Sequence, residues 1–255
     1  MPVIDMTLTL VVPVFNEEIR VSESFDALFD YVADWNWGSR LVFVDDGSTD
    51  RTVAVLREKI ESKDLNFASV IERPHLGKGA SVRWGLKTAG TDIAAFCDVD
   101  LATPLDELDR IIQRSVEIEG LAIGSRSIPG SNVVQRESIK REIAGRAFNR
   151  LVQILACPGI YDTQCGAKAA PVGVWRLVLN DSVEDGFAWD VEVVSRALYE
   201  GIKVSEMPIR WSHDNRSRVN VLSDGLKMTR AIFRMRSQQI IRRDLRSGTR
   251  STEIL

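Results

Sequence analysis

Cysteine is scarce in this chain, which has only three: Cys97, Cys157 and Cys165. They are too few and too widely spaced for a disulfide framework or a structural zinc site. Cys97 falls inside an apolar run, where a cysteine is more often a small core residue than a reactive thiol. A chain without disulfides is typical of a reducing compartment, so the sequence favours a cytoplasmic protein.

The chain also lacks long apolar runs and a strong net charge. No window approaches the roughly 18 consecutive apolar residues that a membrane-spanning helix needs. Residues 1–7 contain Asp5 and no basic cluster, which is not the pattern of a signal peptide. A formal net charge of −3 provides no general attraction to nucleic acid. The sequence therefore predicts a soluble or peripheral membrane protein that does not bind nucleic acid.

What the sequence does have is an alternation of short apolar strands and amphipathic helices. With 255 residues, 44% of them hydrophobic, it can bury the core of one large α/β domain or two small ones. Strand–helix pairs repeat four times over roughly 120 residues, which indicates an α/β fold with a Rossmann-like, mostly parallel sheet and helices on both faces. Pro13 predicts that the first strand stops pairing near its end. The predicted strands cover residues 8–14, 41–44, 67–71, 93–97 and 121–126, with an edge strand over 203–211.

The first candidate site follows the strand 93–97. This run is uncharged, as in a fully buried strand, and Asp98 and Asp100 come directly after it. Residues i and i+2 of a strand project to the same side, so the two carboxylates converge where open α/β sheets bind ligands. Two close carboxylates repel each other unless a cation or hydrogen-bond donors lie between them. Mg²⁺ or Mn²⁺ carrying a diphosphate fits this pair, and a solvated loop is the alternative.

Acidic residues also end the second predicted strand. Asp45 and Asp46 follow residues 41–44, and turn formation alone does not explain two adjacent acids there. Ser48 to Asp50 are suited to cap the next helix. After the first strand, Asn16 is expected to cap the helix that it precedes.

A basic loop precedes a further predicted helix. The loop, residues 73–80, is punctuated by glycines and contains Lys78, which suits it to an anion at the helix N-terminus. It matches neither the Walker A pattern nor Gly-x-Gly-x-x-Gly. His75 in this loop is compatible both with an ordinary loop residue and with a ligand.

Basic residues dominate the chain after the fifth predicted strand. Arg126 ends that strand, and Arg136, Lys140 and Arg141 follow in a run that opens a helix. Together they form a candidate cationic cluster, with a solvated helix face as the alternative.

Two acids begin a helix that is predicted to run to about residue 200. Asp190 and Glu192 diverge by about 200° around a helix, so both cannot face one way. One of them is expected to be only a first-turn charge.

The C-terminal segment predicts a final helix over residues 223–243, with apolar positions among many arginines. A basic amphipathic helix of this kind suits an anionic membrane surface or a partner, and packing against the domain is the alternative. The expected organisation is a domain over 1–218, a basic amphipathic helix over 219–246 and a frayed tail over 247–255.

Taken jointly, the motifs resemble the family 2 inverting glycosyltransferases, whose members have the GT-A-type nucleotide-sugar fold. The resemblance covers about residues 8–240, and its later motifs resemble the branch of dolichyl-phosphate glucosyltransferases and mannosyltransferases, the glucosyl enzymes most. The matching segments are Pro13-Val-Phe-Asn-Glu-Glu18, Val44-Asp-Asp-Gly-Ser-Thr-Asp50, Gly77-Lys-Gly79, Asp98-Val-Asp100, Gly124-Ser-Arg126, Asp162-Thr-Gln-Cys-Gly-Ala-Lys168, Trp189-Asp-Val-Glu192, Trp211 and Ser217-Arg-Val219.

The resemblance implies a role for each matching position. Family members often have a serine four residues after the second acceptor-binding arginine, whereas this chain has Gly145. Many relatives also have C-terminal membrane spans, which this sequence does not show. The implied sets are Pro13, Glu17, Asp45, Asp46, Lys78 and Asp98 for the nucleotide sugar, Asp98 and Asp100 for the metal, Arg126 and Arg141 for the acceptor phosphate, and Asp98, Asp100, Arg126 and Asp190 for catalysis.

The implied reaction is an in-line displacement at the anomeric carbon with inversion. The resemblance favours UDP-glucose over GDP-mannose as donor and a polyprenyl or dolichyl-type phosphate as acceptor, with Mg²⁺ or Mn²⁺ as cofactor. A phosphate monoester is already ionised at neutral pH and needs no strong general base. Two other functions stay open: transfer to a sugar or small-molecule hydroxyl, with Asp190 or Asp185 as base, and nucleotide-sugar binding without catalysis.

Overall fold

The computed structural model describes residues 6–63, 66–135, 139–212 and 228–237, and only the backbone of residues 135, 139–144 and 146–147. Short strands alternate with helices along most of this chain. The elements are β1 (Leu8–Val14), α1 (Glu18–Ala33), β2 (Arg40–Asp45), α2 (Thr52–Glu61), β3 (Ala68–Glu72), α3 (Lys78–Lys87), β4 (Ile93–Cys97), α4 (Leu105–Glu117), β5 (Leu121–Ser125), β6 (Asn132–Gln135), α5 (Ile139–Leu155), β7 (Ala167–Pro171), α6 (Val172–Leu179), α7 (Trp189–Tyr199), β8 (Val204–Pro208) and β9 (Arg210–Ser212).

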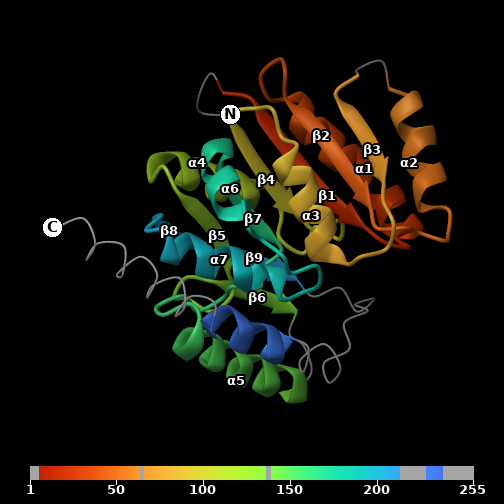
Figure 1. The fold of residues 1–255 in the computed structure, drawn as a ribbon. Helices are drawn as coiled ribbons and strands as arrows, with labels where there is room; N and C mark the ends of the chain where they lie inside the picture. The colour runs from red at the N-terminus through yellow and green to blue at the C-terminus, as the bar shows by residue number, and fades with distance from the viewer. Residues whose placement is uncertain (1–5, 64–65, 136–138, 213–227, 238–255) are drawn as a thin grey trace, which may run out of the picture.

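A seven-stranded sheet in the order β3-β2-β1-β4-β7-β5-β8 forms the centre of the molecule (Figure 1). The strands β1 to β4 pair in parallel, and β5 pairs in parallel with β8. Strand β7 runs antiparallel between β4 and β5. The predicted mostly parallel sheet is confirmed, whereas β7 was not expected as a strand.

The predicted end of pairing at Pro13 holds on one side of β1 only. On the β2 side the ladder continues past Pro13 to Val14, and on the β4 side it ends at Val11. Pro13 is buried within the strand. Proline has no backbone N–H to donate, so its presence is compatible with continued pairing on one side of the strand and with the end of pairing on the other.

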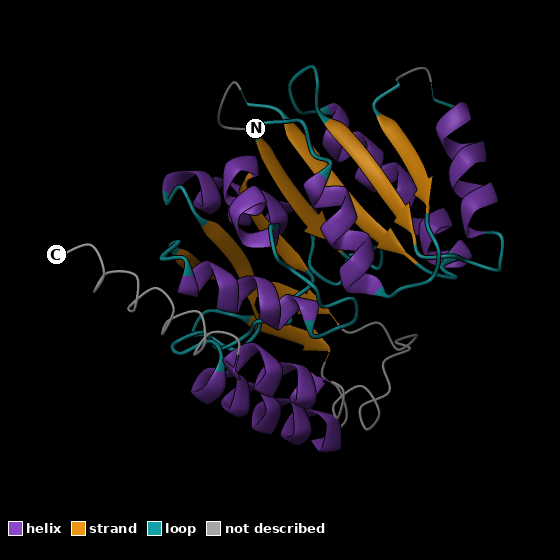
Figure 2. Cartoon of the chain, viewed as in Figure 1, coloured by secondary structure: helices purple, strands orange, loops and turns teal. Residues whose placement is uncertain are grey.

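Helices cover both faces of the sheet, as predicted (Figure 2). On one face, α1, α2 and α4 bury apolar side chains that include Phe25, Leu56 and Ile111. On the other face, α3, α6 and α7 contribute to a second cluster, in which Trp175 and Trp189 are fully buried. Residues on both faces of the central strands are therefore apolar, which explains their lack of polar alternation.

The segment predicted as one edge strand over 203–211 contains two strands. Strand β8 is an edge of the large sheet, as predicted. Strand β9 follows Pro208 closely and pairs with β6 in a separate two-stranded ladder. The proline thus separates two short strands instead of ending one.

Within the predicted final helix, the structure describes residues 228–237, which are helical. Its apolar side chains pack into the cluster that α5, α6 and α7 share: Met228, Ala231, Ile232 and Met235. One side of this stretch therefore packs against the domain, while its outer side exposes Phe233, and the expected contact with a membrane or partner stays a prediction. The rest of 219–246 and the tail 247–255 lie outside the described residues. No helix within the described ranges is long and apolar enough to cross a bilayer.

Candidate active site

The predicted site residues whose side chains the structure describes gather at one edge of the sheet. The carboxyl ends of β1, β2, β4 and β5 lie at this edge, and antiparallel β7 begins there, with Ala167 opposite Cys97. Backbone hydrogen bonds connect the segments that follow the strands, for example Asp46 N to Val14 O at 2.9 Å and Asp98 N to Gly166 O at 3.1 Å. This is the edge at which α/β sheets of this type bind ligands.

Asp98 and Asp100 follow β4, as the sequence predicts, and they interact electrostatically. The Asp98 side chain is 37% exposed, and its Oδ1 lies 2.6 Å from Nζ of Lys78. Asp100 Oδ1 accepts a hydrogen bond of 3.0 Å from the Ala102 amide. Burial, and then the charge of Asp98, raise the pKa of Asp100 above its ordinary value. The pair thus shows the mutual repulsion that a bound cation would relieve.

The position of the Asp98 carboxylate depends on Gly166. A Cβ atom on Gly166 would lie 2.0 Å from Oδ2 of Asp98, closer than any real contact. The backbones of these two residues are joined by the hydrogen bond at the start of β7, so they cannot simply separate. Gly166 therefore provides the space in which the carboxylate lies.

These observations fit a divalent cation. Mg²⁺ and Mn²⁺ prefer oxygen ligands, which Asp98 and Asp100 would supply. The Lys78 ammonium already places a positive charge beside Asp98. No group of three or more metal-binding side chains occurs among the residues that the structure describes. A cation held here would take its remaining ligands from a bound diphosphate and water.

The loop that carries Lys78 packs tightly against the segment before α7. Gly77 has φ +119°, and a Cβ there would lie 2.6 Å from the Asp185 carbonyl oxygen. A Cβ on Gly79 would lie 2.4 Å from Cβ of Trp189. The Ala80 amide donates to Asp185 O at 3.0 Å. This packing fixes the backbone and directs Lys78 toward the acidic pair.

Lys78 remains charged in this environment. Burial would lower its pKa, but Asp98, Asp190 and Asp100 outweigh burial and raise the pKa above its ordinary value. The loop thus presents a permanent cation at the carboxyl edge, which agrees with the predicted role in binding an anion.

Asp45 and Asp46 both accept hydrogen bonds from nearby loops. Asp45 Oδ2 accepts from the amides of Gly47 and Ser48, each at 3.0 Å. Asp46 is 4% exposed, and Gly77 N donates to its Oδ2 at 2.9 Å. His75 Nδ1 lies 2.8 Å from the same oxygen. The two acids therefore hold the loops at the site, and the implied contact of Asp46 with a nucleobase stays a prediction.

The prediction that Asn16 caps the helix after β1 was wrong. Asn16 has φ 54°, and its Oδ1 accepts from the Thr49 amide at 2.7 Å and the Asp50 amide at 3.3 Å. The side chain thus fastens the loop after β2 to the loop after β1. A short amide side chain can cap a helix or bond to the backbone of another loop, so the sequence could not distinguish these two roles.

Glu17, the next predicted residue, is held by an arginine that sequence reasoning missed. Arg20 lies one turn further along α1 and contacts both carboxylate oxygens of Glu17, at 2.8 and 3.0 Å. Arg20 is only 7% exposed, and its charge, with the Ala102 amide, offsets part of the rise in the pKa of Asp100 that burial and Asp98 cause. The i, i+3 spacing of acid and base was the available signal.

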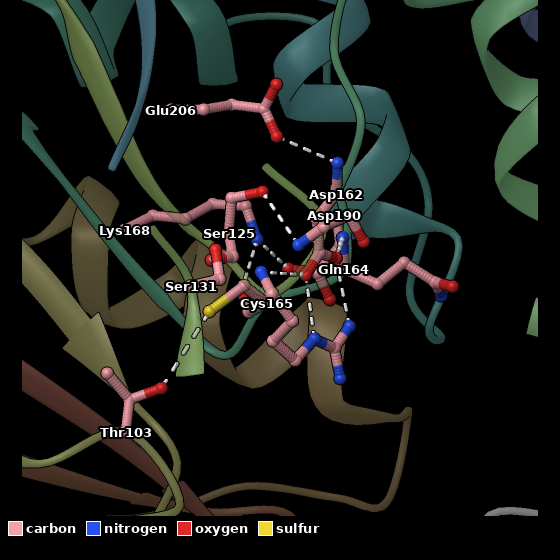
Figure 3. A network of polar contacts seen from close by, with 11 residues as sticks. Thr103, Ser125, Ser131, Asp162, Gln164, Cys165, Lys168, Asp190 and Glu206 are labelled. Atoms are coloured by element: carbon pink, nitrogen blue, oxygen red, sulfur yellow. Dashed lines mark hydrogen bonds and ion pairs between the residues drawn. The ribbon is translucent and has the colours of Figure 1, made fainter. Parts of the chain in front are cut away.

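Arg126 follows β5 and forms a bidentate ion pair with Asp162. Its Nε and one terminal nitrogen donate to the two carboxylate oxygens at 2.7 and 2.9 Å, and its amide donates at 2.9 Å. Burial would raise the pKa of Asp162, but Arg126 outweighs burial and holds it below its usual value. The backbone amide of Asp162 donates to Glu206, as Figure 3 shows. The guanidinium also lies over the Trp211 ring, 5.2 Å from its centroid.

Arg141 lies in α5, but its side chain is outside the described part of the structure. The same holds for Lys140, and Arg136 lies outside the described residues altogether. The predicted cationic cluster therefore has one described member, Arg126, and stays a prediction.

Asp190, the predicted catalytic base, belongs to a buried ion pair. Its Oδ1 lies 2.5 Å from Nζ of Lys168, whose side chain is fully buried (Figure 3). The same ammonium donates to Cys165 O at 2.7 Å. Sequence reasoning quoted Lys168 in a motif but assigned it no role.

The expectation that one of Asp190 and Glu192 is only a first-turn charge was wrong. Both side chains are buried. Glu192 accepts from the Ser182 hydroxyl at 2.7 Å and from the Val183 and Glu184 amides at 2.9 and 3.1 Å. The two acids do point in different directions, but α7 is covered on several sides, so each direction leads to a partner.

The fold and this site define a glycosyltransferase of the GT-A type. A central strand ends in an acidic pair, a basic loop lies beside it, and a mostly parallel sheet carries both. The chain matches the model of Glycosyl transferase family 2 over residues 9–185, and it belongs to this family.

The chain is also similar to individual members of known function and to solved structures. The dolichyl-phosphate beta-glucosyltransferase of Dictyostelium discoideum is 27% identical over 251 residues, which cover 94% of this chain and 77% of the relative. That of Drosophila melanogaster is 28% identical over 242 residues, covering 89% and 74%. Glucosyl-3-phosphoglycerate synthase from Mycobacterium tuberculosis, solved with Mn²⁺, UDP-glucose and phosphoglyceric acid, has a TM-score of 0.64 at 20% identity, covering 92% and 80% of the two chains. This last likeness concerns the fold.

Proposed function

We propose that the enzyme transfers a hexose from a nucleotide sugar to a polyprenyl or dolichyl-type phosphate, with inversion at the anomeric carbon. Glucose from UDP-glucose is the favoured donor sugar, and mannose from GDP-mannose is the second candidate. The names of the most similar relatives support the acceptor class. The observation that carries the proposal is the acidic pair Asp98–Asp100 with Lys78 beside it, at the sheet edge where Arg126 also lies.

The donor half of the site would bind the nucleotide and stabilise its departure. Mg²⁺ or Mn²⁺ held by Asp98 and Asp100 would supply positive charge to the leaving nucleoside diphosphate. Lys78 would add a second cation where negative charge develops. The implied nucleoside side of the pocket comprises Pro13, Glu17, Asp45 and Asp46, which follow or end β1 and β2.

The acceptor half would bind a phosphate and orient it for attack. A phosphate monoester has its second pKa near ~6, so at neutral pH its oxygen is already nucleophilic. Arg126, with Arg141, would position it through charge-assisted hydrogen bonds. The burial of Asp190 against Lys168 supports a positioning role for this acid, which agrees with an acceptor that needs no general base.

Transfer to a hydroxyl is the alternative, and Gly145 favours it because family members often have a serine there. This reaction requires a base. Asp185 is the better placed candidate, since its side chain is 46% exposed and pairs with Arg83, whereas Asp190 is enclosed.

A polyprenyl acceptor also requires contact with a bilayer. On the helix 228–237, the exposed Arg230, Phe233 and Arg236 form an outer side that suits an anionic membrane surface. These exposed residues support the proposal that the enzyme acts as a peripheral protein at the cytoplasmic face of a membrane.

Calorimetric titration with UDP-glucose and GDP-mannose, with and without Mn²⁺, tests the donor half. Binding of one donor should require Mn²⁺ and should be lost in Asp100→Ala. Asp34→Ala, an exposed acid at the far end of α1, is the matched control and should bind normally. Absence of binding of both donors to the unaltered protein would refute the donor assignment.

Asp190→Asn and Asp185→Asn separate the two acceptor classes. If a hydroxyl is the acceptor, loss of the base should reduce turnover by about 100-fold or more. If a phosphate is the acceptor, Asp185→Asn should retain most of the activity. Comparing kcat for both variants with their thermal stability shows whether any loss is due to unfolding.

A further inference from the structure

The ammonium of Lys78 lies against Asp98, one of the two carboxylates that the proposed function assigns to the metal. Its Nζ lies 2.6 Å from Asp98 Oδ1, the distance of a direct charge-assisted hydrogen bond. We propose that Lys78 is a built-in competitor of the metal, which pairs with Asp98 in the free enzyme and moves to the donor diphosphate on binding, so that metal and nucleotide promote each other's binding. The inference rests on the proposed function, because it takes Asp98 as a metal ligand and a nucleoside diphosphate as the leaving group.

The packing of the loop allows this exchange by rotation of one side chain. Gly77 and Gly79 have no room for a Cβ, because the Asp185 carbonyl and Trp189 lie within 2.6 and 2.4 Å of that position. The Ala80 amide is bonded to the same segment. The backbone of Lys78 is therefore held, while its side chain is 20% exposed and ends at the open edge of the sheet.

Neighbouring charges leave Asp98 as the direct partner of Lys78. Two other carboxylates act on Lys78: Asp190, which is already paired with Lys168 at 2.5 Å, and Asp100, which accepts a hydrogen bond from the Ala102 amide at 3.0 Å. Both lysine ammoniums lie over the Phe96 ring, at 5.9 Å for Lys78 and 5.1 Å for Lys168. Asp98 and Asp190 thus each pair with their own lysine, and of these two pairs the Lys78–Asp98 pair is the more exposed and can exchange partners.

Competition for Asp98 couples metal binding to diphosphate binding, as a thermodynamic cycle shows. Metal binding alone must break the Lys78–Asp98 pair, and so must a diphosphate that draws Lys78 away. When both bind, the pair is broken once, so each ligand strengthens the other by the free energy of that pair. A direct bond between metal and diphosphate adds further coupling that does not depend on Lys78.

Lys78→Met tests the inference by titration of Mn²⁺ alone, of UDP alone and of Mn²⁺ at saturating UDP. We expect the variant to bind Mn²⁺ alone more tightly, by about 5- to 50-fold, while the enhancement of Mn²⁺ binding by UDP falls by a similar factor. Lys87→Met removes the same charge from the exposed end of the same helix and should change neither quantity. Lys78→Gln serves as a second variant if Lys78→Met does not fold.

Three other results would overturn the inference. Unchanged Mn²⁺ affinity would show that Lys78 does not compete for Asp98. A rise in Mn²⁺ affinity with an unchanged enhancement by UDP would show only long-range repulsion. If the unaltered protein bound neither Mn²⁺ nor UDP or GDP, the proposed function itself would fail, whereas the first two results leave that function intact.

Discussion

Gly166→Ala should impair metal and nucleotide binding with little loss of stability. The new Cβ would lie 2.0 Å from Oδ2 and 2.5 Å from Cγ of Asp98. The hydrogen bond from Asp98 N to Gly166 O prevents the backbones from separating. The Asp98 carboxylate must therefore rotate away from its present position.

The expected loss of stability is small and the expected loss of Mn²⁺ affinity is large, because the first depends on how far the Asp98 side chain can move and the second on where its carboxylate lies. Overpacking costs about 1–3 kcal/mol in a rigid core. The Asp98 side chain is 37% exposed and can move, so we expect the free energy of unfolding to fall by only about 1 kcal/mol. Displacing a metal ligand should weaken Mn²⁺ binding about 10- to 100-fold, the size of effect seen when the support of a ligand is removed.

Urea denaturation measures the first quantity, and calorimetry with Mn²⁺ and UDP measures the second. Gly173→Ala is the control, because a Cβ there meets nothing within 4 Å in helix α6. It should bind normally and gain up to about 1 kcal/mol in stability. Normal binding by Gly166→Ala, or a loss of stability of several kcal/mol, would refute this reasoning.

Three further predictions concern the buried pairs and the basic loop. Lys168→Met should destabilise the protein by about 3–5 kcal/mol in urea, because it leaves Asp190 buried without its partner, and adding Asp190→Leu should restore much of the loss. Gly79→Ala adds a Cβ within 2.4 Å of the first residue of α7, so thermal unfolding should show a loss of about 1–3 kcal/mol and calorimetry a weaker affinity for UDP. The low pKa of Asp162 means that its stabilising contribution is present above its ordinary pKa of about 4 and is lost as the pH falls through the lower folded-state value. Arg126→Ala lets burial raise that pKa, so the loss of stability on acidification that Asp162 causes should shrink or reverse, and urea denaturation from pH 7 downward should show a flatter decline than in the unaltered protein.

The sequence alone predicted the regular half of the fold well. The first four strands are apolar runs with turn residues after them, and their alternation with helices leaves few topologies to consider. Strand β7 was missed because its sequence, Ala-Lys-Ala-Ala-Pro, has little β propensity. Its conformation is imposed by β4 and β5, which pair with it on both sides. That information is not local.

The site was predicted where one strand end determines it, and less well where distant segments meet. Asp98 and Asp100 could be found from the end of β4. The pairing of Arg126 with Asp162, 36 residues apart, could not be found in this way. Lys168 was quoted in a motif without a role, although its ammonium is fully buried on Asp190. Partners of a long-range ion pair have no characteristic separation along the sequence, which is why these pairs were missed.

The most direct test of the proposed function is product analysis after incubation with UDP-glucose, Mn²⁺ and either a polyprenyl phosphate or the matching polyprenol, which lacks the phosphate. We predict a hexosyl phosphate lipid from the polyprenyl phosphate, detected by mass spectrometry, and no product from the polyprenol. If mannose is the donor sugar, GDP-mannose should instead give the mannosyl phosphate lipid. Transfer to the polyprenol, or to a soluble hydroxyl acceptor with no hexosyl phosphate formed, would contradict the account.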